Sequence, residues 1–90
     1  MISDEELELI LAICDGFTDE DALAKKLNAT PQKISAMIQV LISATPGCVT
    51  GLVMANMQRL GGSTVEHARN IRLTPVGQKV CETKSKIVTC

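Results

Sequence analysis

Aromatic side chains are almost absent from this chain of 90 residues, which has a single Phe, Phe17, and no Trp or Tyr. The hydrophobic share of 46% is nevertheless enough for one small folded domain. The core must therefore be aliphatic, with Met and Cys side chains filling its gaps. We expect one domain that spans residues 1–90.

Long apolar runs are also missing, because no stretch approaches the roughly 18 residues that cross a membrane. The acids that follow Met1 differ from the basic start of a signal peptide, so we expect no secretion signal and a cytoplasmic location. That location favours reduced thiols, although four cysteines could form two disulfides. Cys14 and Cys81 lie in apolar stretches and are expected in the core, whereas the terminal Cys90 is expected to be exposed; the fourth cysteine is Cys48.

Motifs for metal binding and catalysis are missing as well. No two cysteines form a Cys-x-x-Cys pair and His67 is the only histidine, which argues against a zinc site. There is no glycine-rich phosphate loop, and the acids near the N-terminus stand at helix starts, where the helix dipole accounts for them. We therefore expect a protein that is not an enzyme and needs no cofactor or metal.

The most informative segment, residues 20–41, predicts two short helices joined by a tight turn. Asn28 suits the left-handed conformation that ends a helix, and Thr30 and Pro31 suit the N-cap and first position of the next one. This is the helix-turn-helix pattern, which most often places its second helix in the DNA major groove. Apolar residues at helical spacing mark the buried faces: Leu23, Leu27, Ile34, Met37, Ile38 and Leu41.

Residues 23–38 resemble the helix-turn-helix of many bacterial and phage regulators, with Asn28 in place of the usual Gly and Ala36 where Arg is frequent. Before this segment, Ser3 and Glu6 form a capping box for a first helix that ends at Gly16, and Thr18 is expected to cap the second helix. The polar residues of the third helix are expected on its exposed face: Gln32, Lys33, Ser35 and Gln39.

Residues 48–73 allow two interpretations. One is a β-hairpin with strands near 49–59 and 66–73 and a turn at Gly61-Gly62-Ser63. The other makes 50–60 a helix, because Leu52, Val53, Met57 and Leu60 also fit helical spacing. The hairpin is favoured by the segment that follows it.

That segment, Leu73-Thr74-Pro75-Val76-Gly77, resembles the Leu-Thr-Pro-x-Gly that follows the wing in winged-helix regulators of the multiple-antibiotic-resistance repressor (MarR) and PadR kind. The resemblance covers about residues 20–82 and implies an α+β, mainly α fold. Its parts would be a helix-turn-helix core over about 19–43, a two-stranded β wing over about 48–73 and a C-terminal helix over about 75–88. It also implies a small transcriptional regulator, such as a repressor, that binds double-stranded DNA.

The formal net charge of −1 conceals an uneven distribution of charges. Residues 1–28 hold eight acids against two bases and sum to −6, whereas residues 29–90 hold seven bases against two acids and sum to +5. The gathered bases predict a surface that faces a polyanion. Glutamine, lysine and serine can contact base edges, and arginines on a wing can hold phosphates. The expected DNA-binding residues are Thr30, Gln32, Lys33, Ser35, Gln39, Arg59, Arg69 and Arg72.

Each of these groups could instead be ordinary solvated surface, and a second hypothesis is a protein-interaction module. Its working surface would be the acidic N-terminal face, with Asp19, Glu20 and Asp21 at its centre. A homodimer is the expected assembly under the first hypothesis, because regulators of this kind usually dimerise through terminal helices. The apolar stripe of the last helix, Val76, Val80 and Ile87, would then pack on a partner or on the first helix.

Overall fold

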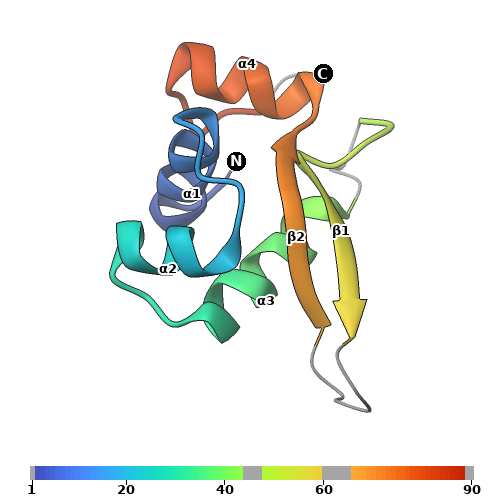
Figure 1. The fold of residues 1–90 in the computed structure, drawn as a ribbon. Helices are drawn as coiled ribbons and strands as arrows, with labels where there is room; N and C mark the ends of the chain where they lie inside the picture. Colours follow the sequence, from blue (N-terminus) through green and yellow to red (C-terminus); the bar gives the residue numbers. More distant parts are fainter. Residues whose placement is uncertain (1, 44–47, 60–65, 89–90) are drawn as a thin grey trace.

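The computed structural model describes residues 2–43, 48–59 and 66–88. Three helices come first, an antiparallel hairpin follows, and a last helix crosses the base of that hairpin (Figure 1). This is the predicted winged-helix topology, and the helical interpretation of residues 50–60 is wrong. The elements are α1 (Asp4–Cys14), α2 (Glu20–Leu27), α3 (Pro31–Ile42), β1 (Val53–Arg59), β2 (Glu66–Leu73) and α4 (Pro75–Thr83).

Helix α1 begins with the predicted capping box. The Ser3 hydroxyl accepts a hydrogen bond from the Glu6 N–H at 3.2 Å, and the Glu6 carboxylate accepts one from the Ser3 N–H at 3.0 Å. The helix ends at Cys14, two residues before Gly16. Both limits follow from local residues, which is why the sequence predicts them.

The turn of the helix-turn-helix also has the predicted conformation. Asn28 adopts φ 54° and ψ 49° after α2, and the Thr30 hydroxyl accepts a hydrogen bond from the Lys33 N–H at 3.2 Å. The start of α2 differs from the prediction, because Asp19 and not Thr18 is its N-cap. The Thr18 backbone instead extends to β2, where its carbonyl accepts a hydrogen bond from Ile71 N–H at 3.0 Å.

The core lies between the three N-terminal helices and the inner face of the hairpin, and it is aliphatic as expected. Its largest fully buried side chains come from all six elements, so one continuous core joins the hairpin to the helices. They are Leu9, Ile10, Leu23, Ile34, Ile38, Val53, Ile71 and Val80.

The entry to the hairpin is fixed by close backbone contacts. Strand β1 starts at Val53 and not near residue 49, because Leu52 N–H donates to the Leu41 carbonyl at 2.8 Å and Thr74 N–H to the Leu52 carbonyl at 3.1 Å. A Cβ on Gly51 would overlap the last carbonyls of α3, and one on Gly77 would overlap the Leu52 carbonyl. The Thr-Pro-x-Gly sequence therefore lets α4 rest directly on the backbone that precedes β1.

The hairpin contains a β-bulge in β2. Met54 pairs with Arg72 and Asn56 with Arg69, so Ala55 alone faces two residues of β2. One of these, Asn70, has φ 53°, and its carbonyl accepts a hydrogen bond from Arg72 Nη1 at 2.9 Å. The extra residue increases the local twist of the hairpin.

Helix α4 is shorter than the predicted 75–88. It ends at Thr83, and Lys84 follows in the left-handed conformation with φ 52°. The residues from Glu82 to Lys86 are all polar, so nothing extends the apolar stripe that would keep them helical against the core. Ile87 lies beyond the helix and is 66% exposed, which corrects its expected place on the stripe.

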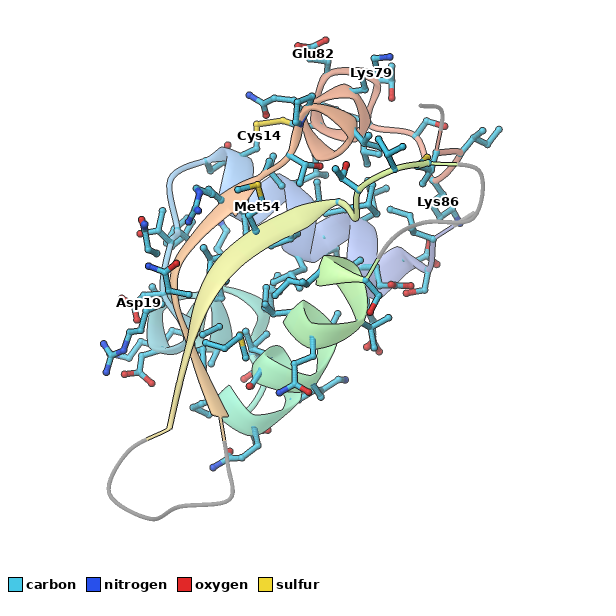
Figure 2. The ribbon with its side chains drawn as sticks, turned by 90° about the vertical axis from the view of Figure 1, so that its right-hand side faces the viewer. Cys14, Asp19, Met54, Lys79, Glu82 and Lys86 are labelled. Carbon is cyan, nitrogen blue, oxygen red and sulfur yellow. A yellow bond between two sulfur atoms is a disulfide. The ribbon has the colours of Figure 1, made fainter. Side chains whose placement is uncertain are left out.

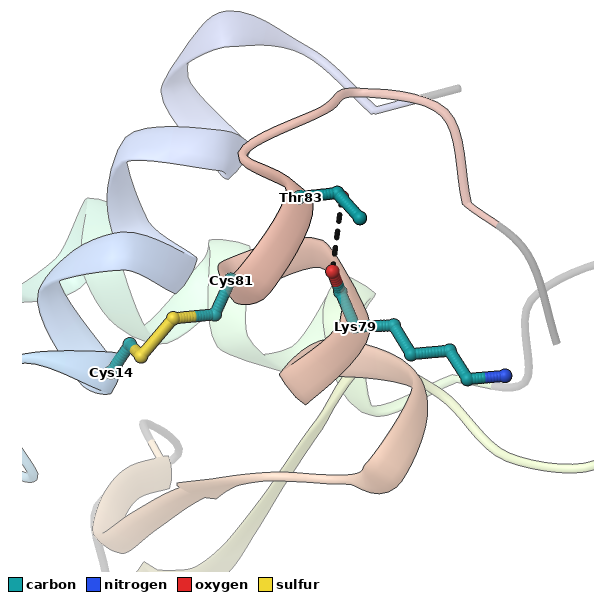
Figure 3. The surroundings of a disulfide bond; sticks show 4 residues. All are labelled: Cys14, Lys79, Cys81 and Thr83. Atoms are coloured by element: carbon teal, nitrogen blue, oxygen red, sulfur yellow. Dashed lines mark hydrogen bonds between the residues drawn. A yellow bond between two sulfur atoms is a disulfide. The ribbon is translucent and has the colours of Figure 1, made fainter.

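The cysteines correct the expectation of reduced core thiols. Cys14 and Cys81 form a disulfide that joins the end of α1 to α4 (Figure 3), with the two Cα atoms 6.4 Å apart. Cys14 is exposed and Cys81 only partly buried, because each stands at the edge of its helix's apolar face. Cys48 is also disulfide-bonded. Sequence spacing could not show that α4 returns to the end of α1.

Some predictions lie outside the described residues: the turn at Gly61-Gly62-Ser63 and the exposure of Cys90. Within the described part of the chain, the longest helix has 12 residues, and none is both long and apolar enough to cross a membrane.

Candidate functional site

The candidate site is the solvent face of α3 together with the hairpin end that lies beside the start of this helix. In Figures 1 and 2 the first turn of α3 and the distal end of the hairpin lie at the same end of the molecule, opposite α4. Gln32, Lys33, Ala36 and Gln39 are exposed on α3, and Thr30 is exposed at its N-cap. The helix therefore presents a polar, nearly uncharged strip.

Ser35 does not belong to that strip. It is only 4% exposed, which corrects its expected place among base-contacting residues. In a 3.6-residue period, Ser35 lies one turn before Ile38 and beside Ile34, both of which are fully buried. The buried face of α3 is thus wider than the apolar residues alone indicate.

Lys33 is the one charged residue of α3, and it is already paired. Its Nζ lies 3.1 Å from Glu5 Oε2 of α1, with the two side chains 52% and 64% exposed. Exposed ion pairs of this kind contribute only about 0–1 kcal/mol, so a phosphate could replace the carboxylate. The pairing was not predicted, because the residues are 28 positions apart and no local signal connects them.

A hollow of about 340 Å³ lies beside this ion pair. Glu5 and Glu8 of α1 line one side, and Thr30 and Lys33 line the other. Two acids one turn apart on α1 therefore stand next to the first turn of α3. Their field weakens the attraction of this region for a polyanion.

Arg69 and Arg72 do not join the α3 surface. They pair with Asn56 and Met54, which are both exposed, and Figure 2 shows the Met54 side chain on the side of the hairpin away from the helices. Arg69 lines a small hollow with Asp19 and Asp21 at the start of α2. The structure thus separates these arginines from Lys33. Arg59 is the last residue of β1 and so stands at the distal end of the hairpin.

Glu20 connects the start of α2 to the hairpin and was expected on an acidic interaction surface. It is 6% exposed, and its Oε1 accepts a hydrogen bond from the Ala68 N–H at 2.7 Å. A buried carboxylate that holds a backbone N–H orients the hairpin against the helices. Glu20 is therefore a structural residue and not part of the acidic surface.

Comparisons of the chain with family models, with curated proteins and with solved structures found no match. Function must therefore be argued from the site itself.

Proposed function

We propose that this protein binds double-stranded DNA, with α3 in the major groove and the distal hairpin along the phosphate backbone, as a small transcriptional regulator of bacterial, phage or mobile-element type. The observation that carries the proposal is the common position of the α3 first turn and the distal hairpin at one end of the molecule. A helix and a β-ribbon that project together can occupy a groove and its adjoining backbone.

Only a few of the exposed side chains on α3 are suited to contact DNA bases. Gln32 and Gln39 are exposed amides, which pair with adenine edges, and Lys33 reaches phosphate or guanine. Arg59 would supply a phosphate contact from the end of β1. Arg69 and Arg72 would contact DNA only where it passes the solvent side of the hairpin.

The Lys33–Glu5 pair gives the proposal a specific test. Fluorescence anisotropy with labelled genomic duplexes at two salt concentrations measures affinity and its salt dependence. Lys33→Ala should weaken binding and reduce the salt slope by about 1. Glu5→Gln should tighten binding, because it releases Lys33 and removes a nearby negative charge.

A matched control separates this effect from the change in net charge. Asp4 stands next to Glu5 on α1 and pairs with Lys86, 2.7 Å away, not with α3. Asp4→Asn changes the net charge by the same amount but should tighten binding less than Glu5→Gln. The proposal would be contradicted if the DNA affinity did not depend on salt concentration, or if Lys33→Ala left the affinity unchanged.

The exposed acids of α1 and α2 favour a second candidate, a protein partner with a basic surface. Asp4, Glu5, Glu8, Asp19 and Asp21 are all exposed. Reversal of Asp19 and Asp21 to Lys, with the buried Glu20 left intact, should abolish that interaction. If the double variant keeps its partner, the acidic face is not the working surface.

A DNA partner also implies a cytoplasmic location, where disulfides are rare outside hyperthermophiles. Thiol trapping in cells would measure the state of Cys14 and Cys81. If Cys14 and Cys81 are oxidised in the compartment that contains DNA, the cytoplasmic location is supported. If both are fully reduced there, the disulfide-bonded form is not the cellular form.

A further inference from the structure

Strand β1 is an edge strand whose outer side is unpaired. The sheet has two strands among the described residues, and Val53–Met57 form hydrogen bonds only within the hairpin. On the other side of the sheet, the Thr18 carbonyl already bonds to Ile71 of β2. Every second residue of an edge strand directs its N–H and C=O away from its partner. The outer side of β1 therefore offers a row of backbone groups to another strand.

The sequence of β1 does not protect this edge. Residues 53–58 contain no charged residue and no proline, which are two of the features with which natural edge strands discourage pairing. The bulge at Asn70 lies in β2, so it leaves the outer side of β1 regular.

Apolar side chains gather at the start of the same strand. Four large apolar residues in the described part of the chain are notably exposed, and two of them belong to β1 or to the segment that leads into it. Met54 is in the strand and 44% exposed, and Val49 precedes it and is 97% exposed. Exposed apolar side chains beside an open edge are typical of an interface.

We propose that β1 pairs with β1 of a second copy of this chain, antiparallel and about a two-fold axis. A two-fold axis places residues 53–58 opposite the same residues of the second copy. Because these residues carry no charge, the pairing brings no like charges together. We place the axis at Asn56, which puts Asn56 opposite its own copy and keeps residues that face the core on the core side across the pair. The pairing occupies the β1 edge of both copies, so the dimer has no free β1 edge to bind a third copy. A contact that forms filaments would leave such an edge free.

This dimer differs from the one expected through the last helix. In α4, Gly77 and Val80 are buried within the protomer, and Cys81 is bonded to Cys14. The apolar side of α4 is therefore already occupied, whereas the edge of β1 is not.

Sedimentation of the full oxidised chain without DNA, from micromolar to millimolar concentration, tests the proposal. The mass should rise from 9.6 kDa toward twice that value. Asn56→Glu should weaken the dimer at least about tenfold, because it brings two carboxylates together across the axis. The protomer should tolerate this change, since Arg69 lies opposite Asn56 in β2.

Gln78→Glu is the matched control, because Gln78 is exposed on α4 and the charge change is the same. It should leave the dimer unchanged, and circular dichroism verifies that both variants are folded. Hydrogen exchange of the wild type should show the Val53–Met57 amides becoming more protected as concentration rises.

A mass of 9.6 kDa at every concentration overturns the proposal. So does equal dimerisation by Asn56→Glu, equal weakening by Gln78→Glu, or concentration-dependent protection of α4 in place of β1. No DNA enters these measurements, so their failure leaves the proposed function to its own test.

Discussion

The two ends of the molecule are built from different kinds of contact. Where α4 meets the hairpin, backbones approach so closely that Gly77 allows no Cβ, and a disulfide joins α1 to α4. At the opposite end, the start of α3 presents exposed polar side chains and a half-exposed ion pair. Stability is thus concentrated at one end and candidate binding groups at the other. Substitutions should be able to change one property without the other.

Gly77→Ala should have the largest effect on stability. The new Cβ would overlap the Leu52 carbonyl, so α4 would have to move, at a cost of about 4 kcal/mol or more. Gly16→Ala is the control, because Gly16 has φ +108° but no neighbour within 4 Å, and it should cost only about 1–2 kcal/mol. Urea denaturation measures both, and equal losses would mean that the close contact is unimportant.

Removal of the Cys14–Cys81 disulfide should come next. The bond joins residues 67 positions apart, and the double Ser variant should lose about 3 kcal/mol of unfolding free energy. Reduction is a less specific test, because Cys48 is also disulfide-bonded. The DNA affinity of the folded variant should match that of the wild type. A loss of affinity without unfolding would show that the two ends are coupled.

Glu20→Ala should lower stability by about 2 kcal/mol, because the buried Ala68 N–H loses its charged acceptor. Asp21→Ala, at the exposed neighbouring position, should change the unfolding free energy by less than about 0.5 kcal/mol. Thermal melts of the two variants compare them directly. Similar melting temperatures would show that the Glu20–Ala68 hydrogen bond does not stabilise the packing of the hairpin on the helices.

Glu5→Gln should have the smallest effect on stability, below about 1 kcal/mol, since the ion pair that it breaks is exposed. The same substitution is expected to change DNA affinity, which would separate binding from folding at this end. A large fall in melting temperature would show that α1 depends on Lys33 for its position.

Local residues predict most of the fold. Ser3 with Glu6, Asn28, and Thr74 with Pro75 each determine the conformation of a few neighbouring residues, so their roles can be derived from sequence alone. The hairpin could be predicted from the Leu-Thr-Pro-x-Gly segment that follows it. The start of β1 at Val53 could not, because it depends on backbone contacts with α3 and Thr74.

The candidate site could be predicted only in part. The exposure of Gln32 and Gln39 follows from helical period, but the burial of Ser35 depends on how wide a face of α3 the neighbouring elements cover. Pairing of Lys33 with Glu5, and of Cys14 with Cys81, joins residues far apart in the chain. Contacts of that kind depend on tertiary packing, which the spacing of residues along the sequence does not reveal.

The bulge at Asn70 determines which changes in length the hairpin can accept. Because Asn70 is one residue more than β1 provides, Ala68 and Ile71 both face the core while Arg69 and Arg72 both face water. Deletion of Asn70 would remove the bulge and its added twist, but it would leave Arg69 opposite Asn56 and Ala68 opposite Met57, each on its present face. The hairpin should therefore accept a single deletion at the bulge, whereas a single residue inserted between Ile71 and Leu73 would need a second bulge to keep the faces of β2 unchanged.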